Sequence, residues 1–495
     1  MKKEDHSFLR SIKKLKVLVI GDLIMDAYFY GACSRIAPEA SVPVIDIQRK
    51  SYCLGGAANA AANLAALGCK VTLCTVIGAD EVGKQSKTML ADLGIDTQHL
   101  ILDNHRKTLL KTRVVSPSQL LLRYDEGDAS PITAVTAKNF VSQLELAYQD
   151  CDLVLIADYH KGVIGAAVIS ALSSLLQEQP KFLAIDSKRL HSFSALSPSL
   201  VKPNYEEAMQ LLGLTPDYNT NRVQQLTTLG RRLFEKTNAK QIVLTLDNEG
   251  GICFENGHYQ ADFAAPKVSG NHTSGAGDTF LAVYMLASYL NMSLEETAHL
   301  ACKAAGLVID KQDTAICTAA ELELALFADD KLVKSKVQMR KRCELLKTQG
   351  KKIVFTNGCF DVLHSGHVDY LQKAKSLGDI LIVGVNNDES VKRLKGQERP
   401  INHLAHRMEV LKALACVDYV ISFGSSGNDT PTSVLQYVLP DIFAKGGDYK
   451  YKDLPERRLL KRMGAEIVFL PYVNGQSSTR LIKRMANGVK LAAAN

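Results

Sequence analysis

The chain has 495 residues, more than a single hydrophobic core usually organises, so a small one-domain module is excluded. Hydrophobic residues make up 46% and charged residues 22%, which is close to the globular average and excludes a mainly disordered chain. The net charge of +7 is uneven, because residues 331–495 carry 28 Lys and Arg against 15 Asp and Glu. Since these cations are interspersed with acidic residues and the sequence has no Trp, we expect phosphate ligands and no nucleic acid.

Neither a membrane segment nor a secretion signal is predicted. The first apolar run, residues 17–20, is too short for a signal peptide, and nowhere do about 18 apolar residues follow one another. The eleven cysteines include no CxxC pair and lie in apolar stretches, which is typical of reduced thiols. We therefore expect a soluble, cytoplasmic protein without a membrane partner.

Apolar runs of strand length recur through the first two thirds of the chain, with helix-length segments between several of them. They lie at residues 16–20, 71–77, 153–157, 182–185 and 241–246. This alternation predicts an α/β fold with a mostly parallel sheet covered by helices. Two segments rich in β-branched residues, 42–47 and 108–124, predict a small flap beside that sheet.

The composition becomes polar and charged around residues 327–349, where a helix is predicted over 337–348. A fresh series of strands follows, at residues 352–356, 380–385, 419–423, 442–444 and 467–470. We therefore predict one domain over residues 1–330, a linker with a lead-in helix over 331–349, and a second domain over 350–495.

The richest motif of the first domain is Thr-Ser-Gly-Ala-Gly-Asp-Thr-Phe at residues 273–280, which opens an apolar helix. Small residues at a helix N-terminus let backbone N–H groups approach an anion, and the helix dipole attracts it. Asp278 would repel a phosphate there unless it has a chemical task, such as taking the proton from an attacking hydroxyl. A glycine-rich turn with an ordinary Asp in the first helical turn is the alternative.

Two other segments have weaker signals. An Ala-rich helix is preceded by Gly55 and Gly56 and has Asn59 near its start. Glycines permit a ligand to approach closely, and the side chains of Asn59 and Asp26 match the donors and acceptors of a sugar. The stretch 204–207, Asn-Tyr-Glu-Glu, could organise magnesium-bound water near a nucleotide. A helix N-cap with Glu at its third position explains the same four residues equally well.

Together and in this order, these motifs resemble the ribokinase-like (PfkB) family of carbohydrate kinases over about residues 8–320. The resemblance implies that Asp278 is the catalytic base, that Gly275, Ala276 and Gly277 form an anion hole, and that the flap is a lid over the substrate. It further implies an ATP–magnesium site containing Asn204, Tyr205, Glu206, Glu207, Thr245 and Gly250, and a sugar site containing Asp26, Gly55, Gly56 and Asn59.

Three positions depart from that family's pattern. His272 stands where Asp is usual, Lys303 stands where Asn is common, and residues 310–314 replace a glycine-containing stretch near the adenine. Because Asp278 and the anion hole remain, we expect an active kinase in which ATP affinity is the property most altered.

In the second domain, Thr-Asn-Gly-Cys-Phe-Asp-Val-Leu-His-Ser-Gly-His follows a strand at residues 356–367 and runs into a helix. His364 and His367, three residues apart, share a helix face and point at whatever the N-terminus binds, for which an α-phosphate is the natural occupant. They could stabilise charge on the phosphorus and on the departing pyrophosphate. A zinc site with His403 and His406 is disfavoured, because no Cys or carboxylate cluster completes it.

Two later loops also suit phosphate. Residues 475–482, Gly-Gln-Ser-Ser-Thr-Arg-Leu-Ile, open a last predicted helix with hydroxyls and a cation, although an ordinary Ser N-cap is the alternative. The loop 445–449, Lys-Gly-Gly-Asp-Tyr, follows a strand and could face phosphate or sugar.

Residues 350–487 resemble the HxGH nucleotidyltransferase family of cytidylyl- and adenylyltransferases. The resemblance implies a Rossmann-like fold in which His364 and His367 are catalytic. It further implies a nucleotide site containing Gly358, Phe360, Lys375, Asp388, Arg407, Ser478 and Thr479.

The fusion of two such domains resembles the bifunctional heptose kinase/adenylyltransferases of ADP-heptose synthesis. The resemblance implies ATP-dependent C1 phosphorylation of D-glycero-β-D-manno-heptose 7-phosphate, then transfer of AMP from ATP to the heptose 1-phosphate. It also implies Mg²⁺ carried by ATP rather than held in a protein cage, a product for lipopolysaccharide synthesis, and a homo-oligomer such as a dimer. On charge alone, Lys161, Arg35 and Arg123 are candidates for the sugar's 7-phosphate.

Two alternatives belong to other classes. A different sugar kinase could be joined to a different transferase, such as a cytidylyl enzyme, which CTP and ATP would distinguish. Alternatively, the kinase half could be inactive, or the protein could bind polynucleotide in a salt-sensitive manner.

Overall fold

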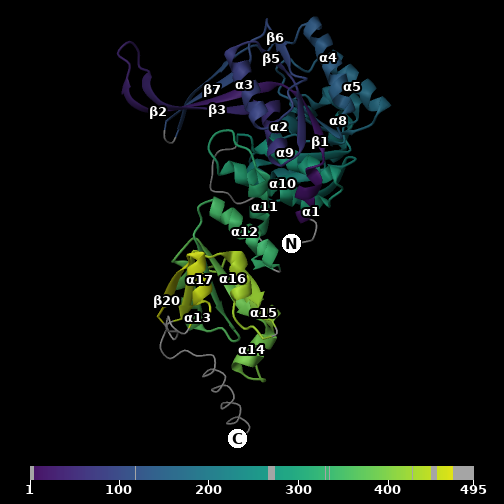
Figure 1. Ribbon diagram of the computed structural model, residues 1–495. Helices are drawn as coiled ribbons and strands as arrows, with labels where there is room; N and C mark the ends of the chain where they lie inside the picture. Colours follow the sequence, from purple (N-terminus) through teal and green to yellow (C-terminus); the bar gives the residue numbers. More distant parts are fainter. Residues whose placement is uncertain are drawn as a thin grey trace. The chain divides into compact units, whose positions relative to one another are not determined.

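The computed structural model describes residues 5–116, 119–265, 274–328, 331–333, 335–425, 427–446 and 454–471. The chain divides into two compact units, residues 1–323 and 324–495, which are described separately. Both are α/β, as the sequence predicted (Figure 1).

The first unit is built on an eight-stranded sheet of order β14-β13-β12-β11-β10-β9-β1-β4. The strands from β4 to β12 are parallel, and β13 and β14 are added antiparallel at one edge. The main strands are β1 (Lys16–Gly21), β4 (Lys70–Cys74), β9 (Leu153–Asp158), β10 (Phe182–Ser187), β11 (Leu200–Val201), β12 (Gln241–Thr245), β13 (Gly251–Glu255) and β14 (His258–Phe263). A parallel pair, β5 (Val76–Gly78) and β6 (Ile101–Asp103), lies outside this sheet, so the predicted strand 71–77 is in fact two strands.

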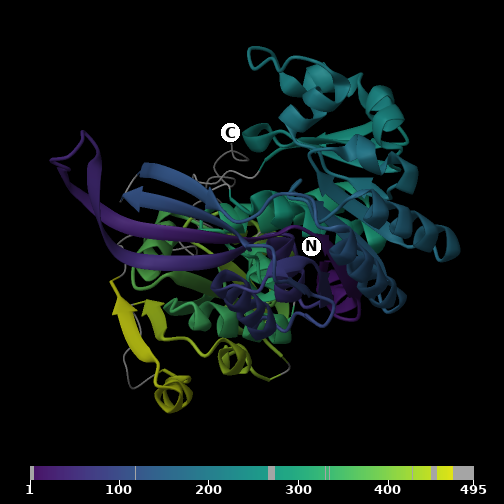
Figure 2. The same ribbon diagram turned by 90° about the horizontal axis from the view of Figure 1, so that it is seen from above.

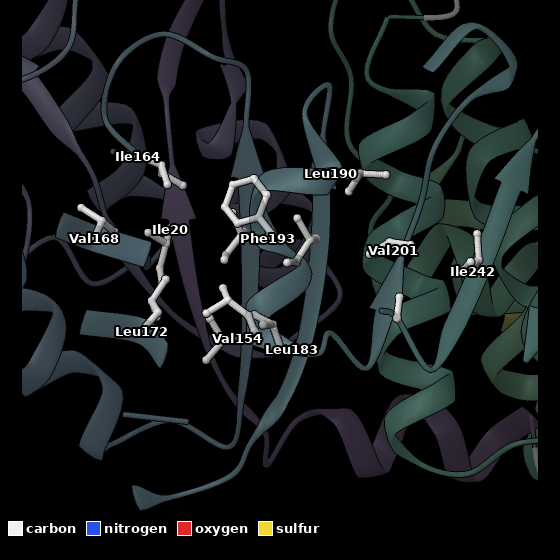
Figure 3. Close-up of a cluster of buried hydrophobic side chains, with 14 of the residues drawn as sticks. Ile20, Val154, Ile164, Val168, Leu172, Leu183, Leu190, Phe193, Val201 and Ile242 are labelled. Carbon is white, nitrogen blue, oxygen red and sulfur yellow. The ribbon is translucent and has the colours of Figure 1, made fainter. Parts of the chain in front are cut away.

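Continuous apolar runs make these strands because both faces of a parallel sheet are covered. In β9 all six residues are buried. Side chains from β1, β9, β10, β11 and β12 pack with those of α5 and the 3₁₀ segment Leu190–Leu196 to form one cluster (Figure 3). The helices of this unit are α1 (Asp5–Ile12), α2 (Ala57–Ala66), α3 (Glu81–Asp92), α4 (Ala134–Gln149), α5 (Ala166–Glu178), α6 (Tyr205–Leu212), α7 (Arg222–Thr227), α8 (Gly230–Thr237), α9 (Ala276–Tyr289), α10 (Leu294–Ile309) and α11 (Ala319–Ala328).

A second, four-stranded sheet of order β3-β2-β7-β8 projects from the first unit (Figures 1 and 2). It contains β2 (Leu23–Ile36), β3 (Pro43–Gly56), β7 (Leu109–Ser116) and β8 (Gln119–Glu126). We call these four strands the lid. The flap predicted from residues 42–47 and 108–124 is confirmed, but β2 was missed because its sequence lacks a regular alternation.

The second unit contains a six-stranded parallel sheet of order β15-β18-β17-β16-β19-β20. Its strands are β15 (Leu332–Val333), β16 (Ile353–Gly358), β17 (Ile380–Asn386), β18 (Tyr419–Phe423), β19 (Ile442–Gly446) and β20 (Glu466–Leu470). Its helices are α12 (Lys336–Thr348), α13 (Ser365–Lys375), α14 (Asp388–Lys395), α15 (Leu404–Lys412), α16 (Thr432–Val438) and α17 (Arg457–Met463). From β16 the chain builds the sheet in both directions, so a crevice is expected where the order reverses, between β16 and β19.

Residues 331–349 were expected to be a linker with a lead-in helix. The helix is present, but the segment is an integral part of the second unit. β15 extends its sheet beside β18, and Met339, Cys343 and Leu346 of α12 are buried in its core. The polar composition that indicated a linker belongs to the exposed face of α12. None of the helices in the described part of the chain has the length and apolarity to cross a bilayer.

Candidate active sites

The first site is at the N-terminus of α9, where Gly275 is the N-cap residue. Its φ of 84° is in the left-handed region, and a Cβ there would meet the Asn59 side chain at 3.0 Å. Glycine is therefore required by both backbone and packing. Ala276, Gly277 and Asp278 follow as the first three helical residues, so their N–H groups are among those left without helical acceptors.

Asp278 is held by hydrogen bonds to both of its carboxylate oxygens. The Tyr159 hydroxyl donates to Oδ1 at 2.8 Å, and the Asn59 side-chain amide donates to Oδ2 at 2.6 Å. Asn59 comes from α2 and Tyr159 from the loop after β9, so three distant segments meet at this carboxylate.

Burial raises the pKa of Asp278 to about 6, and the nearby negative charge of Asp186 adds to this effect. The Lys202 ammonium lies 3.1 Å from Asp186 and is itself buried. The two hydrogen bonds to Asp278 and the nearby positive charge of Lys202 partly offset the rise in the pKa of Asp278. A carboxylate with a pKa near 6 is ionised at neutral pH yet more basic than an ordinary Asp, as a general base requires.

A pocket of about 210 Å³ opens in front of Asp278. Its lining comes from the carboxyl ends of β9 and β10, the segment after β11, and the start of α9: Asp158, Tyr159, Asp186, Ser187, Lys188, Lys202, Asn204, Glu207, Gly275, Gly277 and Asp278. Ligands of open parallel sheets bind at this end of the strands.

On the predicted nucleotide side, Asn204 and Glu207 make a complete capping box at the start of α6 and also line the pocket. The helix-cap interpretation is thus confirmed, and the magnesium–nucleotide interpretation stays a prediction for two side chains that line the pocket. Tyr205 is a correction, because its ring is fully buried in the core and its hydroxyl contacts Asp217 and Gln225. Glu206 is exposed and accepts a hydrogen bond from Tyr218 instead of lining the pocket.

Two further predicted residues lie beside this segment. Thr245, the last residue of β12, pairs with Asn204 through a β-bridge. Gly250 has a φ of 97°, and a Cβ there would lie 1.8 Å from the Phe263 carbonyl oxygen, so no other residue fits that turn.

On the predicted sugar side, Asp26 is bound by the Arg113 guanidinium at 2.6 Å and by the Thr314 hydroxyl at 3.1 Å. A Cβ on Gly55 would lie 2.4 Å from the Asp26 carboxylate, so the glycine permits this close approach. Gly56 is the N-cap of α2, with a φ of 58°.

The three cations proposed for the sugar's second phosphate are not equivalent. Arg35 is near the far end of β2, nine residues beyond Asp26 and thus about 30 Å along the strand. It is therefore remote from the site of its own chain, which corrects that prediction. Arg123 pairs with Asp125 on the lid at 2.6 Å, and Lys161 is partly buried in the loop after β9.

Sequence reasoning missed a fourth cation, Lys111. It is the cross-strand partner of Asp26 and Asp125, and its ammonium lies 5.9 Å from the Tyr159 ring centre. Burial and the positive charges of Arg123 and Lys161 lower its pKa, as expected for cations gathered around a place for an anion. Alternation along β7 would have placed Lys111 on the Asp26 face, but only once the register was known.

Of the departures from the family pattern, His272 lies outside the described residues, and Lys303 is in α10. Residues 312–314 contact the lid: Tyr28 bonds Thr314 at 2.9 Å, Tyr30 donates to Asp313, and Arg49 donates to Gln312 at 3.3 Å.

The second site is the turn between β16 and α13. His364 is the N-cap residue of α13 and His367 its third helical residue, and their ring centres are 3.9 Å apart. Phe360, with a φ of 45°, sits against His367 with ring centres 5.5 Å apart, and its ring packs over Gly358. The predicted convergence of the two imidazoles at a helix N-terminus is thus present.

Both imidazoles are short of hydrogen-bond partners within the described residues. Three buried ring nitrogens have no hydrogen-bond partner there: Nδ1 and Nε2 of His364, and Nδ1 of His367. Burial lowers the pKa of His367 to about 4, with a further contribution from His364, and burial also lowers the pKa of His364. The rings are therefore neutral at pH 7 and have capacity for an anionic ligand.

Three predicted nucleotide-site residues have structural roles instead. The fully buried Arg407 guanidinium donates to the carbonyls of Cys359 and Asn386 and to Asp388 at 2.8 Å, which ties the ends of β16 and β17 together. Asp388 is thereby engaged and also accepts the Leu404 N–H.

Lys375 is at the C-terminal end of α13, about 17 Å along the helix from His364. It pairs with Asp418 at 2.5 Å, so it does not face the histidines.

Across the crevice between β16 and β19, the Lys445 ammonium donates to the Asn357 side chain at 2.9 Å. This lysine begins the glycine loop identified in the sequence. Ser478 and Thr479 lie outside the described residues.

Comparison with known proteins agrees with this division. Residues 14–322 match the pfkB family of carbohydrate kinases, and residues 355–484 match the cytidylyltransferase-like family. The bifunctional protein HldE of Helicobacter pylori (strain J99) is 38% identical, with 95% of this chain and 98% of that protein covered. The HldE of Desulfatibacillum aliphaticivorans is 35% identical, with 98% of each covered.

The chain belongs to the HldE family of bifunctional proteins. Its HldE-type organisation joins a sugar kinase to a nucleotidyltransferase, both acting on small-molecule substrates. The kinase fold is also that of the solved ribokinase of Arabidopsis thaliana complexed with ribose and ATP, with a TM-score of 0.50 and 18% identity. That alignment covers 63% of this chain and 99% of the ribokinase.

Proposed function

We propose that the first unit transfers the γ-phosphoryl group of ATP to the C1 hydroxyl of D-glycero-β-D-manno-heptose 7-phosphate. The observation that carries this proposal is Asp278, a carboxylate with a raised pKa at the helix N-terminus that would receive the phosphates. Asp278 takes the proton of the hydroxyl, the O1–phosphorus bond forms, and the bond to the ADP oxygen breaks. The Gly275–Gly277 backbone N–H groups stabilise charge on the transferred group.

The sugar is placed by the groups that surround Asp26. Asp26 and Asn59 offer acceptors and donors to hydroxyls, and Gly55, which has no side chain, lets the Asp26 carboxylate lie close against the backbone there. Lys111, Lys161 and Arg123 supply the positive charge that a second phosphate on the sugar requires. This arrangement favours a phosphorylated sugar over a neutral one.

The second unit transfers AMP from ATP to heptose 1-phosphate, releasing pyrophosphate. The α-phosphate lies at the N-terminus of α13, where His364 and His367 donate hydrogen bonds to it and to the leaving pyrophosphate. A phosphate oxygen of the sugar attacks the α-phosphorus as the bond to pyrophosphate breaks. Lys445, facing the crevice opposite Asn357, adds positive charge to that region. Removal of the 7-phosphate between the two reactions requires a separate phosphatase.

Mg²⁺ is the divalent ion that we propose for both reactions, carried by ATP. In the described part of the chain, no group of three His, Cys, Asp or Glu residues is arranged to hold a metal. The kinase pocket nevertheless fits an ATP-bound ion, because Glu207 is among its lining residues and hard carboxylate oxygens suit Mg²⁺. When bound, the ion would neutralise charge on the β- and γ-phosphates.

We also propose that the protein is cytoplasmic, where ATP is available, and that it forms a homodimer through the lid. Large apolar side chains of the lid are exposed, including Ile36, Val42, Leu120 and Leu122. Leu120 and Leu122 are on the edge strand β8, Ile36 ends β2, and Val42 directly precedes the edge strand β3. A second lid would cover such surfaces.

The test is ³¹P NMR of the purified protein with Mg²⁺, ATP and heptose 7-phosphate. ADP and a new anomeric phosphate signal are expected. Heptose 1-phosphate with ATP or CTP then tests the second reaction, and pyrophosphate is expected with ATP. No anomeric phosphate from folded protein would refute the kinase proposal, and faster turnover with CTP would refute adenylyl transfer.

A further inference from the structure

The hydrogen bond between Tyr159 and Asp278 connects the proposed base to a loop that the reaction described above does not use. The Tyr159 hydroxyl donates to Asp278 Oδ1 at 2.8 Å. On the other side, Asn59 can present only its amide group to Oδ2, because its own oxygen accepts from Asn63 at 3.3 Å. The Asp278 carboxylate thus accepts hydrogen bonds from two different segments, and each of its oxygens keeps one lone pair for the substrate.

Tyr159 is itself fixed in place. The buried Asp22 carboxylate accepts the backbone N–H groups of Tyr159, Lys161 and Val163 at 2.9 to 3.1 Å. Three bonds to one carboxylate leave this loop little freedom, so the phenol cannot easily turn away from Asp278.

We propose that Tyr159 is a positioning residue of the kinase, whose hydroxyl holds the Asp278 carboxylate in its productive orientation and keeps it ionised at neutral pH. This inference rests on the proposed role of Asp278 as the base. The other charged groups that face Asp278 are Asp186 from β10 and Lys202 from the segment after β11.

The chemistry sets the direction of the effect. A donor to a carboxylate stabilises its ionised form, and the Tyr159 bond lowers the pKa of Asp278 against the rise due to burial. Burial and the Asp278 charge raise the pKa of Tyr159 well above its ordinary value, so the phenol stays protonated and remains a donor. During the reaction the proton from the sugar hydroxyl passes to Asp278, while Tyr159 keeps its own.

The experiment is the pH dependence of kcat/KM for sugar phosphorylation in the full-length Tyr159→Phe variant. The acidic limb, near pH 6 in the wild type, should move up by about one to two pH units, as loss of a hydrogen bond to a charged group implies. Activity should then fall about 5- to 50-fold at pH 6 and much less at pH 8.5. An equal loss at every pH, or an unmoved limb, would overturn the proposal.

Tyr259→Phe is the matched control. It removes another Tyr–Asp hydrogen bond, to Asp262 at 2.6 Å on an exposed strand remote from the pocket, and should leave the profile unchanged. A fluorinated tyrosine at position 159 preserves the shape and is a stronger donor, so the limb should move to lower pH. That substitution decides the question even if Tyr159→Phe fails to fold.

Failure of this inference can be separated from failure of the proposed function. If Asp278→Asn keeps full kinase activity, Asp278 is not the base. If that variant is inactive and Tyr159→Phe shows no shift of the limb, only the positioning role is refuted.

Discussion

The two units prepare their reactive groups in opposite ways. In the kinase unit the key carboxylate, Asp278, already has a partner on each oxygen and a charged neighbour in Asp186. In the transferase unit, the partly buried His364 and His367 have three buried ring nitrogens that lack partners in the described part of the chain. We therefore expect the first site to be complete before substrate arrives and the second to be completed by its ligand.

The difference follows from what each reaction demands. A base must be aimed at a single proton and must hold its pKa near the working pH, so it needs fixed neighbours. Groups that stabilise a phosphate and a departing pyrophosphate need unused donors, and the cost of leaving imidazoles unpaired is recovered when the anion binds. The shifted pKa values have the corresponding directions: raised for Asp278 and lowered for the histidines.

Replacing the proposed base, Asp278, should give the largest effect. Asp278→Asn keeps the shape but cannot accept the proton, so sugar phosphorylation should fall by about 10²–10⁴-fold, the usual contribution of a general base. AMP transfer, measured as pyrophosphate release in the same preparation, should be unchanged. Parallel loss of both activities would show that the two sites are not independent.

Removing an imidazole should affect only the other reaction. His367→Ala deletes one anion donor at α13 and should reduce AMP transfer by about 10²–10³-fold, as removal of a single oxyanion donor does. ADP formation from heptose 7-phosphate serves as the internal control for folding of the first unit. A variant that retains AMP transfer would remove His367 from the proposed mechanism.

The titration of His367 tests whether its site is completed by the ligand. Its pKa of about 4 is below the ordinary value of 6.5, so in the free protein the ring costs stability increasingly as the pH falls from about 6.5 towards 4. Phosphates of bound ATP favour the imidazolium form, and the midpoint should rise by about two units. NMR of the ring protons measures both states. His364→Asn removes the neighbouring ring and should raise the free midpoint, and an ATP-independent midpoint would contradict the contact.

Replacing a buried cation and a partly exposed cation of the second unit compares their contributions to its stability. Arg407→Met removes the buried donor to the Cys359 and Asn386 carbonyls beside a partly exposed Asp388, and should destabilise the second unit by about 2–4 kcal/mol. Lys375→Met breaks a partly exposed pair with Asp418 and should cost about 1 kcal/mol or less. Urea unfolding measures both.

The same pair tests the reassignment of Lys375. Lys375→Met should leave AMP transfer intact. A large loss of transfer by Lys375→Met at unchanged stability would return this lysine to the nucleotide site.

The sequence predicted those site residues whose role is visible locally. Gly275 and Asp278 lie within one helix start, and His364 and His367 share one turn, so spacing alone brings each set together. Most parallel strands of both sheets were predicted because they are continuous apolar runs. The two-residue strands β11 and β15 and the antiparallel strands β13 and β14 were missed.

Residues brought together by the register of distant elements were not predictable in this way. Asp186, Lys202, Tyr159 and Lys111 reach the kinase site from four separate elements, and each is unremarkable in its local sequence. The wrong predictions have the same cause. Arg35 and Lys375 carry a suitable charge but lie at the wrong end of their strand and helix. Arg407 was predicted from its charge alone, whereas its guanidinium is buried.

The contact between the lid and residues 312–314 has a consequence for biosynthesis. Tyr28 and Asp26 bond to Thr314, a residue 286 and 288 positions further along the chain. Contacts of such long sequence separation slow folding, and they cannot form until the ribosome has delivered almost the whole first unit. The long strands β2 and β3 are therefore synthesised early and have exposed apolar edges. Their contacts with residues 312–314 form only after the last helices of the kinase unit have been synthesised. The nascent lid is thus the segment on which we expect a chaperone to act first.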